Sequence, residues 1–272
     1  MEAPLAARGS GSFAEATWAA HERAAGRNPV VFDTSTLAGL PEPAVRLLSA
    51  ALPDGTPLHD VVRLSMRGEI KLAGRWLQFT AEQILRANVG FVWAAKVGGR
   101  LLSFVGADAL GPDGARVEFR LHRRIPVVRG SGPDIARSAN GRLAAETVAW
   151  LPMALTPQAG ARWTATDEHQ ATVSLRGPGG PTDVVVAVDD SGALASLGLQ
   201  RWKDSARPPR LVAFGGTVDS VLAAPEGVAV AGSGAVGWDW RTPDETEGVF
   251  FRYQITRAEF GPSRAVRDRE ER

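Results

Sequence analysis

The strict alternation of apolar and polar side chains between Val62 and Leu72 limits most strongly what this chain can fold into. One side of the segment carries Val62, Leu64, Met66, Ile70 and Leu72, and the other carries Arg63, Ser65, Arg67, Glu69 and Lys71. Because neighbouring side chains of a strand point to opposite faces, this pattern predicts a half-buried antiparallel strand. Ala73-Gly74 then predicts a turn.

Similar runs follow this segment at short and regular intervals. Strands are predicted at 76–86, 90–97, 101–110 and 115–122, and again at 161–168, 170–176, 183–189, 194–203, 210–222, 227–240 and 248–260. Turns at Asn88, Gly98-Gly99 and 111–114 separate the first group, and no helical crossover interrupts either group. Each group is therefore expected to form an antiparallel meander.

Helices are predicted at three places. Two lie near the N-terminus, at 13–25 and 41–52, and a long helical insert at about 133–151 divides the two groups of strands and stops at Pro152. The expected fold class is mainly β with a helical insert. We expect a large curved antiparallel sheet or half-barrel of about a dozen strands. The long helix would pack on, or plug, its concave face.

The chain is expected to form one domain. No linker-like segment supports two domains, so residues 13–262 are assigned to a single β-rich domain. Residues 1–12 are predicted to be a disordered N-terminus, and 263–272 a solvated charged tail.

Composition excludes several classes of function. With 31 basic and 30 acidic residues, the chain lacks the charge excess expected of a nucleic-acid-binding protein. The absence of cysteine excludes disulfides and thiolate chemistry, and four scattered histidines predict no metal site and no cofactor. No apolar run approaches the ~18 residues of a membrane span, and residues 1–12 lack a signal-peptide pattern. A cytoplasmic protein is therefore expected.

Four polar residues fall on otherwise apolar faces of predicted strands. These are Gln83, Asp108, Asp167 and Arg201. A polar group that faces a core costs about 1–3 kcal/mol unless it is paired. Each therefore requires a partner, a water molecule or a ligand.

The predicted helix offers partners for these groups. Arg142, Glu146 and Trp150 lie at i, i+4 and i+8, which places them on one stripe. If the stripe faces the sheet, Arg142 and Glu146 share an interior with Asp108, Asp167 and Gln83. Three interpretations remain open: a surface ion pair, a buried structural network, or a ligand site. For Asp167, turn chemistry is a further alternative.

Tryptophan is unusually frequent, with eight residues against a single tyrosine. Trp93 and Trp163 are among those on predicted strands. Such residues either pack in a core or form the aromatic wall of a cavity for an apolar ligand.

A series of short motifs resembles one bacterial family that is catalogued only as a domain of unknown function. The motifs are Leu40-Pro41-Glu42-Pro43, residues 66–70 (MRGEI), 76–83 (WLQFTAEQ), 90–93 (GFVW), 142–146 (RLAAE), Trp150-Leu151-Pro152, and Trp163 with Asp167. The resemblance spans roughly residues 40–260 and implies no particular reaction. More distantly, a half-barrel with a helical plug is similar to LolA-like lipoprotein carriers, a likeness of fold alone.

The leading functional hypothesis is the binding of an apolar small molecule or a lipid in an aromatic-lined cavity. Its predicted ligand contacts are Gln83, Trp93, Arg142, Trp150, Trp163 and Arg201, with the two arginines orienting a carboxylate or phosphate head group. The alternative is a cavity enzyme that uses Glu146, Asp108 or Asp167 as general acid or base, for cyclisation, isomerisation or epoxide opening in a biosynthetic pathway. A purely structural interaction module is the third possibility.

Overall fold

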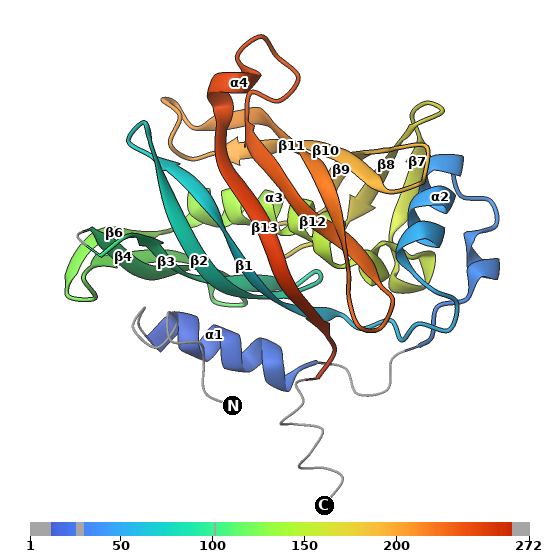
Figure 1. Ribbon diagram of the computed structural model, residues 1–272, viewed down its shortest axis with the longest axis horizontal. Helices are drawn as coiled ribbons and strands as arrows, with labels where there is room; N and C mark the ends of the chain where they lie inside the picture. The colour runs from blue at the N-terminus through green and yellow to red at the C-terminus, as the bar shows by residue number, and fades with distance from the viewer. Residues whose placement is uncertain (1–11, 26–29, 101, 263–272) are drawn as a thin grey trace, which may run out of the picture.

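One continuous 13-stranded antiparallel sheet forms the body of the protein (Figure 1). This computed structural model describes residues 12–25, 30–100 and 102–262. The curved sheet and the long helix on its concave side confirm the predicted fold class. Of the disordered N-terminus predicted for residues 1–12, residues 1–11 lie outside the described residues, and Ser12 begins a helix instead. The solvated tail predicted for 263–272 also lies outside the described residues.

The elements follow the predicted order closely. The first group of strands is β1 (Val61–Leu72), β2 (Arg75–Arg86), β3 (Gly90–Gly98), β4 (Ser103–Gly111), β5 (Gly114–Leu121) and β6 (Ile125–Ser131). The second group is β7 (Arg162–Ala165), β8 (Gln170–Leu175), β9 (Thr182–Val188), β10 (Leu194–Lys203), β11 (Arg210–Ala223), β12 (Ala229–Trp238) and β13 (Val249–Phe260). The helices are α1 (Ser12–Arg23), α2 (Glu42–Ala51), α3 (Pro133–Trp150) and the short α4 (Glu245–Gly248), with 3-10 turns at Thr34–Leu37, Pro152–Leu155 and Pro157–Ala159.

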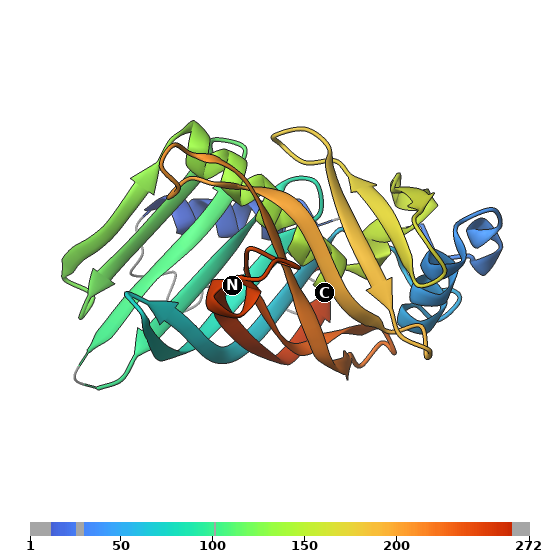
Figure 2. The same cartoon turned by 90° about the horizontal axis from the view of Figure 1, so that it is seen from above.

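The two meanders join at the centre of the sheet. The strand order is β6-β5-β4-β3-β2-β1-β13-β12-β11-β10-β9-β8-β7, so the first and last strands of the chain are neighbours. Helix α3 connects the two outer edges, and it crosses the concave face of the sheet (Figure 2). Its 18 residues span about 27 Å at 1.5 Å per residue.

Strand β6 is absent from the sequence-based prediction. It is an edge strand, and nearly all of its side chains are exposed, including Ile125, Val127 and Val128. A strand without a buried face has no apolar–polar alternation, which is the signal on which the prediction depended.

The main core fills the space between the concave face and α3. The second half of α3 is almost wholly buried, and it includes three alanines, Ala144, Ala145 and Ala149. Short side chains let the helix lie deep in the concavity, and they also leave unfilled volume beside it. The cavity described below occupies part of that volume.

Helix α1 covers the opposite, convex face. Trp18 packs there with a second apolar cluster that includes Ile84, Val92 and Ala107. His21 is buried at this contact, with Nε2 3.4 Å from the carbonyl oxygen of Leu110. Burial lowers the pKa of His21 from 6.5 to about 4, although the Leu110 carbonyl opposes the change.

We expect this histidine to make the fold less stable in acid. The unfolded chain takes up the proton near pH 6.5 and the folded chain only near pH 4, so the stability falls as the pH drops through this window. The loss attributable to His21 is about 3 kcal/mol at its limit. Urea unfolding of wild type and His21→Gln at several pH values between 4 and 6.5 measures this loss of stability. Parallel pH profiles for the two proteins would contradict the assignment.

Candidate functional site

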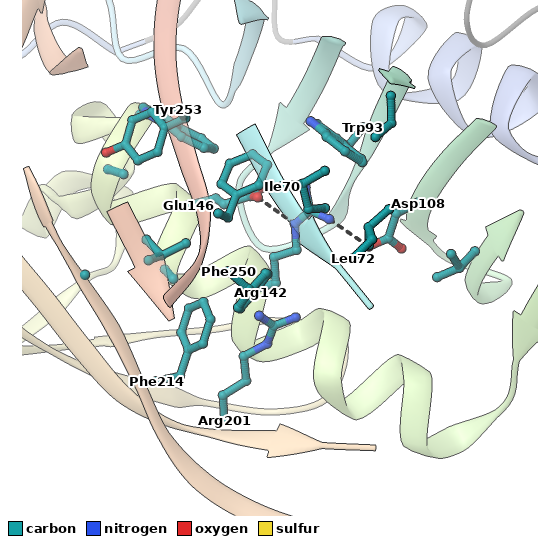
Figure 3. Close-up of a pocket in the computed structure, with 18 of the residues that line it drawn as sticks. Ile70, Leu72, Trp93, Asp108, Arg142, Glu146, Arg201, Phe214, Phe250 and Tyr253 are labelled. Carbon is teal, nitrogen blue, oxygen red and sulfur yellow. Dashed lines mark hydrogen bonds and ion pairs between the residues drawn. The ribbon is translucent and has the colours of Figure 1, made fainter. Parts of the chain in front are cut away.

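A cavity of about 500 Å³ lies between the concave face and α3 (Figure 3). Both meanders contribute to its wall, which is largely aliphatic and aromatic. Its polar members are Asp108, Arg142, Glu146, Arg201, Thr217 and Tyr253. Burial raises the pKa of Tyr253, so its phenol stays protonated over the ordinary pH range.

Strand register brings three of the predicted site residues together. Gln83 on β2 lies opposite Trp93 on β3, and Trp93 lies opposite Asp108 on β4. Residues directly opposite in an antiparallel pair project to the same face. The three side chains therefore form one row across the sheet, facing the stripe of Arg142, Glu146 and Trp150 on α3.

Arg142 is the centre of a partly buried ion-pair network. Its Nε lies 2.6 Å from Glu146 Oε1, and its Nη1 lies 2.7 Å from Asp108 Oδ2. Burial by itself would lower the pKa of Arg142, but the two carboxylates outweigh burial and raise it. Only 16% of the Arg142 side chain, 12% of Glu146 and 21% of Asp108 is exposed, so the surface-pair interpretation is wrong.

Gln83 completes the environment of Glu146. It is fully buried, and its Nε2 donates to Glu146 Oε2 at 2.6 Å. Both oxygens of Glu146 are thus occupied as acceptors. Gln83 does not line the cavity, so it is not placed to contact a ligand there as predicted. Its hydrogen bond instead orients Glu146.

Arg201 faces the same cavity from β10 and has a different environment. Its Nε donates to the Ser138 carbonyl at 3.0 Å, and its guanidinium lies 4.6 Å from the centre of the Phe214 ring. Burial, followed by the like charge of Arg142, lowers the pKa of Arg201 to about 10, so it remains charged at neutral pH. Within the described ranges, no carboxylate lies within 4.0 Å of Arg201.

Two buried polar atoms of cavity-lining residues lack a hydrogen-bond partner among the described residues. They are Asp108 Oδ1 and Trp93 Nε1. Gln83 Oε1, in the same row, is also without one. Buried polar groups are normally satisfied, so these atoms mark the place where a water molecule or a ligand group is required. The described residues contain no group of three or more His, Asp or Glu side chains suited to a metal ion.

Gly141 allows α3 to approach Arg201 closely. A Cβ at this position would lie 2.9 Å from Arg201 Cγ and 3.5 Å from Leu199 Cδ1. On an exposed helix, Gly→Ala stabilises by about 1 kcal/mol, but here the methyl group has no space. We expect Gly141→Ala to destabilise the fold by about 1–3 kcal/mol, measured by urea unfolding. A gain in stability would show that Arg201 moves away freely.

Besides Gln83, two further predicted site residues do not line the cavity. Asp167 is in the turn after β7, where it accepts from the His169 backbone N–H at 2.9 Å and from Gln170 Nε2 at 2.7 Å. Its proposed convergence with Asp108 and Glu146 is therefore wrong, because β7 ends at Ala165 and the alternation ends with it. Trp163 packs against the main core and donates to the Leu155 carbonyl at 2.8 Å.

Trp93 and Trp150 are the tryptophans that line the cavity. Trp150 also donates through Nε1 to the Ala231 carbonyl at 3.2 Å, which joins α3 to β12. Sequence reasoning missed the aromatic residues of the second meander, Phe214, Phe250, Phe251 and Tyr253. The alternation of Phe251, Tyr253 and Ile255 along β13 is the signal that indicates a buried face there.

Comparison with known proteins places the chain in a family. Residues 30–252 match a family of unknown function, DUF6544. The chain belongs to this family. The match confirms the resemblance expected for residues 40–260, and the family carries no assigned reaction. A search of curated proteins found no match for this DUF6544 member.

Several solved structures share the general arrangement of the chain. A DUF1329 family protein from Desulfovibrio piger has 11% identity and a TM-score of 0.42, covering 80% of this chain and 90% of its own. A putative outer membrane lipoprotein-sorting protein domain from Vibrio parahaemolyticus has 10% identity, coverage of 78% and 90%, and a TM-score of 0.40. A LolA superfamily protein from Nitrosomonas europaea has 10% identity, coverage of 82% and 94%, and a TM-score of 0.41. Similarity at this level carries no functional information.

Proposed function

We propose that this protein binds an apolar small molecule or a lipid in the cavity between α3 and the sheet. The observation that carries the proposal is the cavity itself, with a volume of about 500 Å³ and a mostly apolar wall. Ligand pockets commonly have volumes of about 300–1,000 Å³, with a few polar groups that fix orientation.

The polar groups favour a ligand with an acceptor or acidic end. Arg142 is already held by Asp108 and Glu146, so it is poorly placed to bind a further anion. Arg201 keeps its charge and, among the described residues, has no carboxylate partner within 4.0 Å. In this proposal Arg201 binds the head group, and the apolar part of the ligand lies along Trp93, Trp150 and Phe251.

Titration with cis-parinaric acid, a fluorescent polyene fatty acid, tests this proposal. Because Trp93 and Trp150 line the wall, a bound polyene accepts energy from them, and tryptophan emission should fall saturably at one ligand per chain. Arg201→Met should weaken binding of the acid about tenfold and leave the affinity for a long-chain alcohol nearly unchanged. Non-saturable quenching would count against the binding function.

A second candidate function follows from Asp108. Its Oδ1 is buried, lies in a cavity-lining residue and is without a hydrogen-bond partner in the described part of the chain. We propose, as the alternative, that Asp108 transfers a proton to or from a bound substrate. Glu146 is less suited to this, because Arg142 and Gln83 occupy both of its oxygens.

Chromatography of the ligand retained by wild type and by Asp108→Asn separates the two functions. An enzyme would retain product in the wild type and substrate in the variant. Isomerisation leaves the mass unchanged, so retention time is the necessary readout. The same compound in both proteins would leave ligand binding as the function.

A further inference from the structure

Exposed apolar side chains gather at the tips of the hairpins β3–β4 and β5–β6. Among the described residues, Leu102 is 46% exposed, Ile125 60%, Val127 45% and Val128 49%. Scattered exposed apolar residues are ordinary, but a contiguous group indicates an interaction surface. We refer to residues 96–100, 102–103 and 121–129 as the hairpin-tip surface.

The two hairpin tips lie side by side. The backbone N–H of His122 donates to the carbonyl of Ser103 at 2.8 Å, and both tips project from the same end of the sheet (left in Figures 1 and 2). In a meander, alternate turns fall at the same end. The two segments therefore form one surface although residues 104–120 separate them in the chain.

Charge on this surface is strongly one-sided. Segments 96–103 and 121–129 contain Lys96, Arg100, Arg123, Arg124 and Arg129, and they contain no aspartate or glutamate. The chain as a whole has 31 basic and 30 acidic residues, so this segregation is local. All five basic side chains are on exposed residues; Arg129 also lies 3.5 Å from Glu118 on β5.

The hairpin-tip surface is continuous with the cavity. Val127 and Val128 line the cavity directly. Ile125 lies opposite Leu121, which lies opposite the cavity-lining Phe104, so all three project from the concave face. An apolar path thus leads from the exposed tips to the cavity wall.

We propose that the hairpin-tip surface docks on an anionic lipid bilayer. The apolar side chains enter the boundary between head groups and acyl chains, and the arginines contact lipid phosphates. Docking in this way places the exposed cavity-lining residues Val127 and Val128 at the membrane, where an apolar ligand enters without crossing water. The role given to the cavity rests on the proposed function, whereas the docking itself does not.

Flotation of the purified protein with vesicles tests the proposal. Wild type should float with vesicles that contain phosphatidylglycerol, less so in high salt, and should not float with phosphatidylcholine alone. Arg100→Gln with Arg124→Gln should weaken the binding about twentyfold, because each basic residue near an anionic surface contributes about a factor of five. Leu102→Ser with Ile125→Ser should weaken it at every salt concentration.

Matched changes elsewhere provide the control. Arg176→Gln with Val221→Ser makes one change of each kind, arginine to glutamine and aliphatic to serine, at exposed residues outside the hairpin-tip surface, and it should leave vesicle binding unchanged. Failure of the wild type to float, equal flotation with both vesicle types, or hairpin variants that behave like this control would overturn the proposal. An acidic protein partner would then be the chemistry to test.

Titration of the same variants with cis-parinaric acid keeps the two proposals separate. Arg100, Leu102, Arg124 and Ile125 do not line the cavity, so the titration should be unchanged in the hairpin variants. If the protein binds vesicles but its titration with cis-parinaric acid does not saturate, the cavity function is contradicted and the docking proposal stands. If the titration saturates but the protein does not bind vesicles, the docking proposal is contradicted and the cavity function stands.

Discussion

Replacement of Arg142 by methionine is expected to destabilise the fold by about 3 kcal/mol. Methionine keeps most of the length and apolar contact of the side chain but leaves Asp108 and Glu146 without their shared cation. Removal of one partner from a buried ion pair typically costs about 3–5 kcal/mol, because the remaining charge is unpaired and poorly solvated. Urea unfolding at neutral pH measures this loss.

Two further variants locate the cause of the loss. Arg252→Met removes an ion pair of similar type, but Arg252 is 56% exposed and lies 3.4 Å from Glu69, so a loss below about 1 kcal/mol is expected. Adding Asp108→Asn and Glu146→Gln to Arg142→Met should restore most of the stability, since none of these three positions then carries an unpaired charge. Equal losses of stability in Arg142→Met and Arg252→Met would show that the Arg142 network behaves as a solvent-exposed one.

Ala149→Trp is expected to abolish ligand binding while the fold stays intact. Ala149 is buried in the second half of α3, and its side chain borders the cavity. A tryptophan at this position enters space that is already empty, so the free energy of unfolding should change by no more than about 1 kcal/mol. The affinity for cis-parinaric acid should fall by at least a hundredfold.

Ala144→Trp is the matched control for this substitution. Ala144 lies on the same helix with similar burial but does not line the cavity. The indole has to displace packed neighbours there, and a loss of about 1–3 kcal/mol or more is expected. A cavity that does not bind ligand would leave the titration the same in wild type and Ala149→Trp.

Much of the candidate site was predictable because its signals are local. The spacing of Arg142, Glu146 and Trp150 follows from the helical period, and Asp108 stands out as a charge on an apolar strand face. The placement of Asp167 and Trp163 was not predictable in this way. It depends on β7 ending at Ala165. A strand of four residues is too short for the alternation of apolar and polar side chains to indicate where the strand ends.

Local sequence patterns were sufficient to predict the long helix, the stripe of α3 that faces the sheet, and every strand of both meanders except β6. These follow from periodicities of two and 3.6 residues, which neighbouring side chains record directly. Three features became visible only in the folded chain: β1 pairs with β13, α3 crosses from β6 to β7, and a cavity remains beside α3. Pairing between strands so far apart in the chain depends on which edges meet, and a cavity is the volume that packing leaves unfilled. Neither is encoded in any single segment.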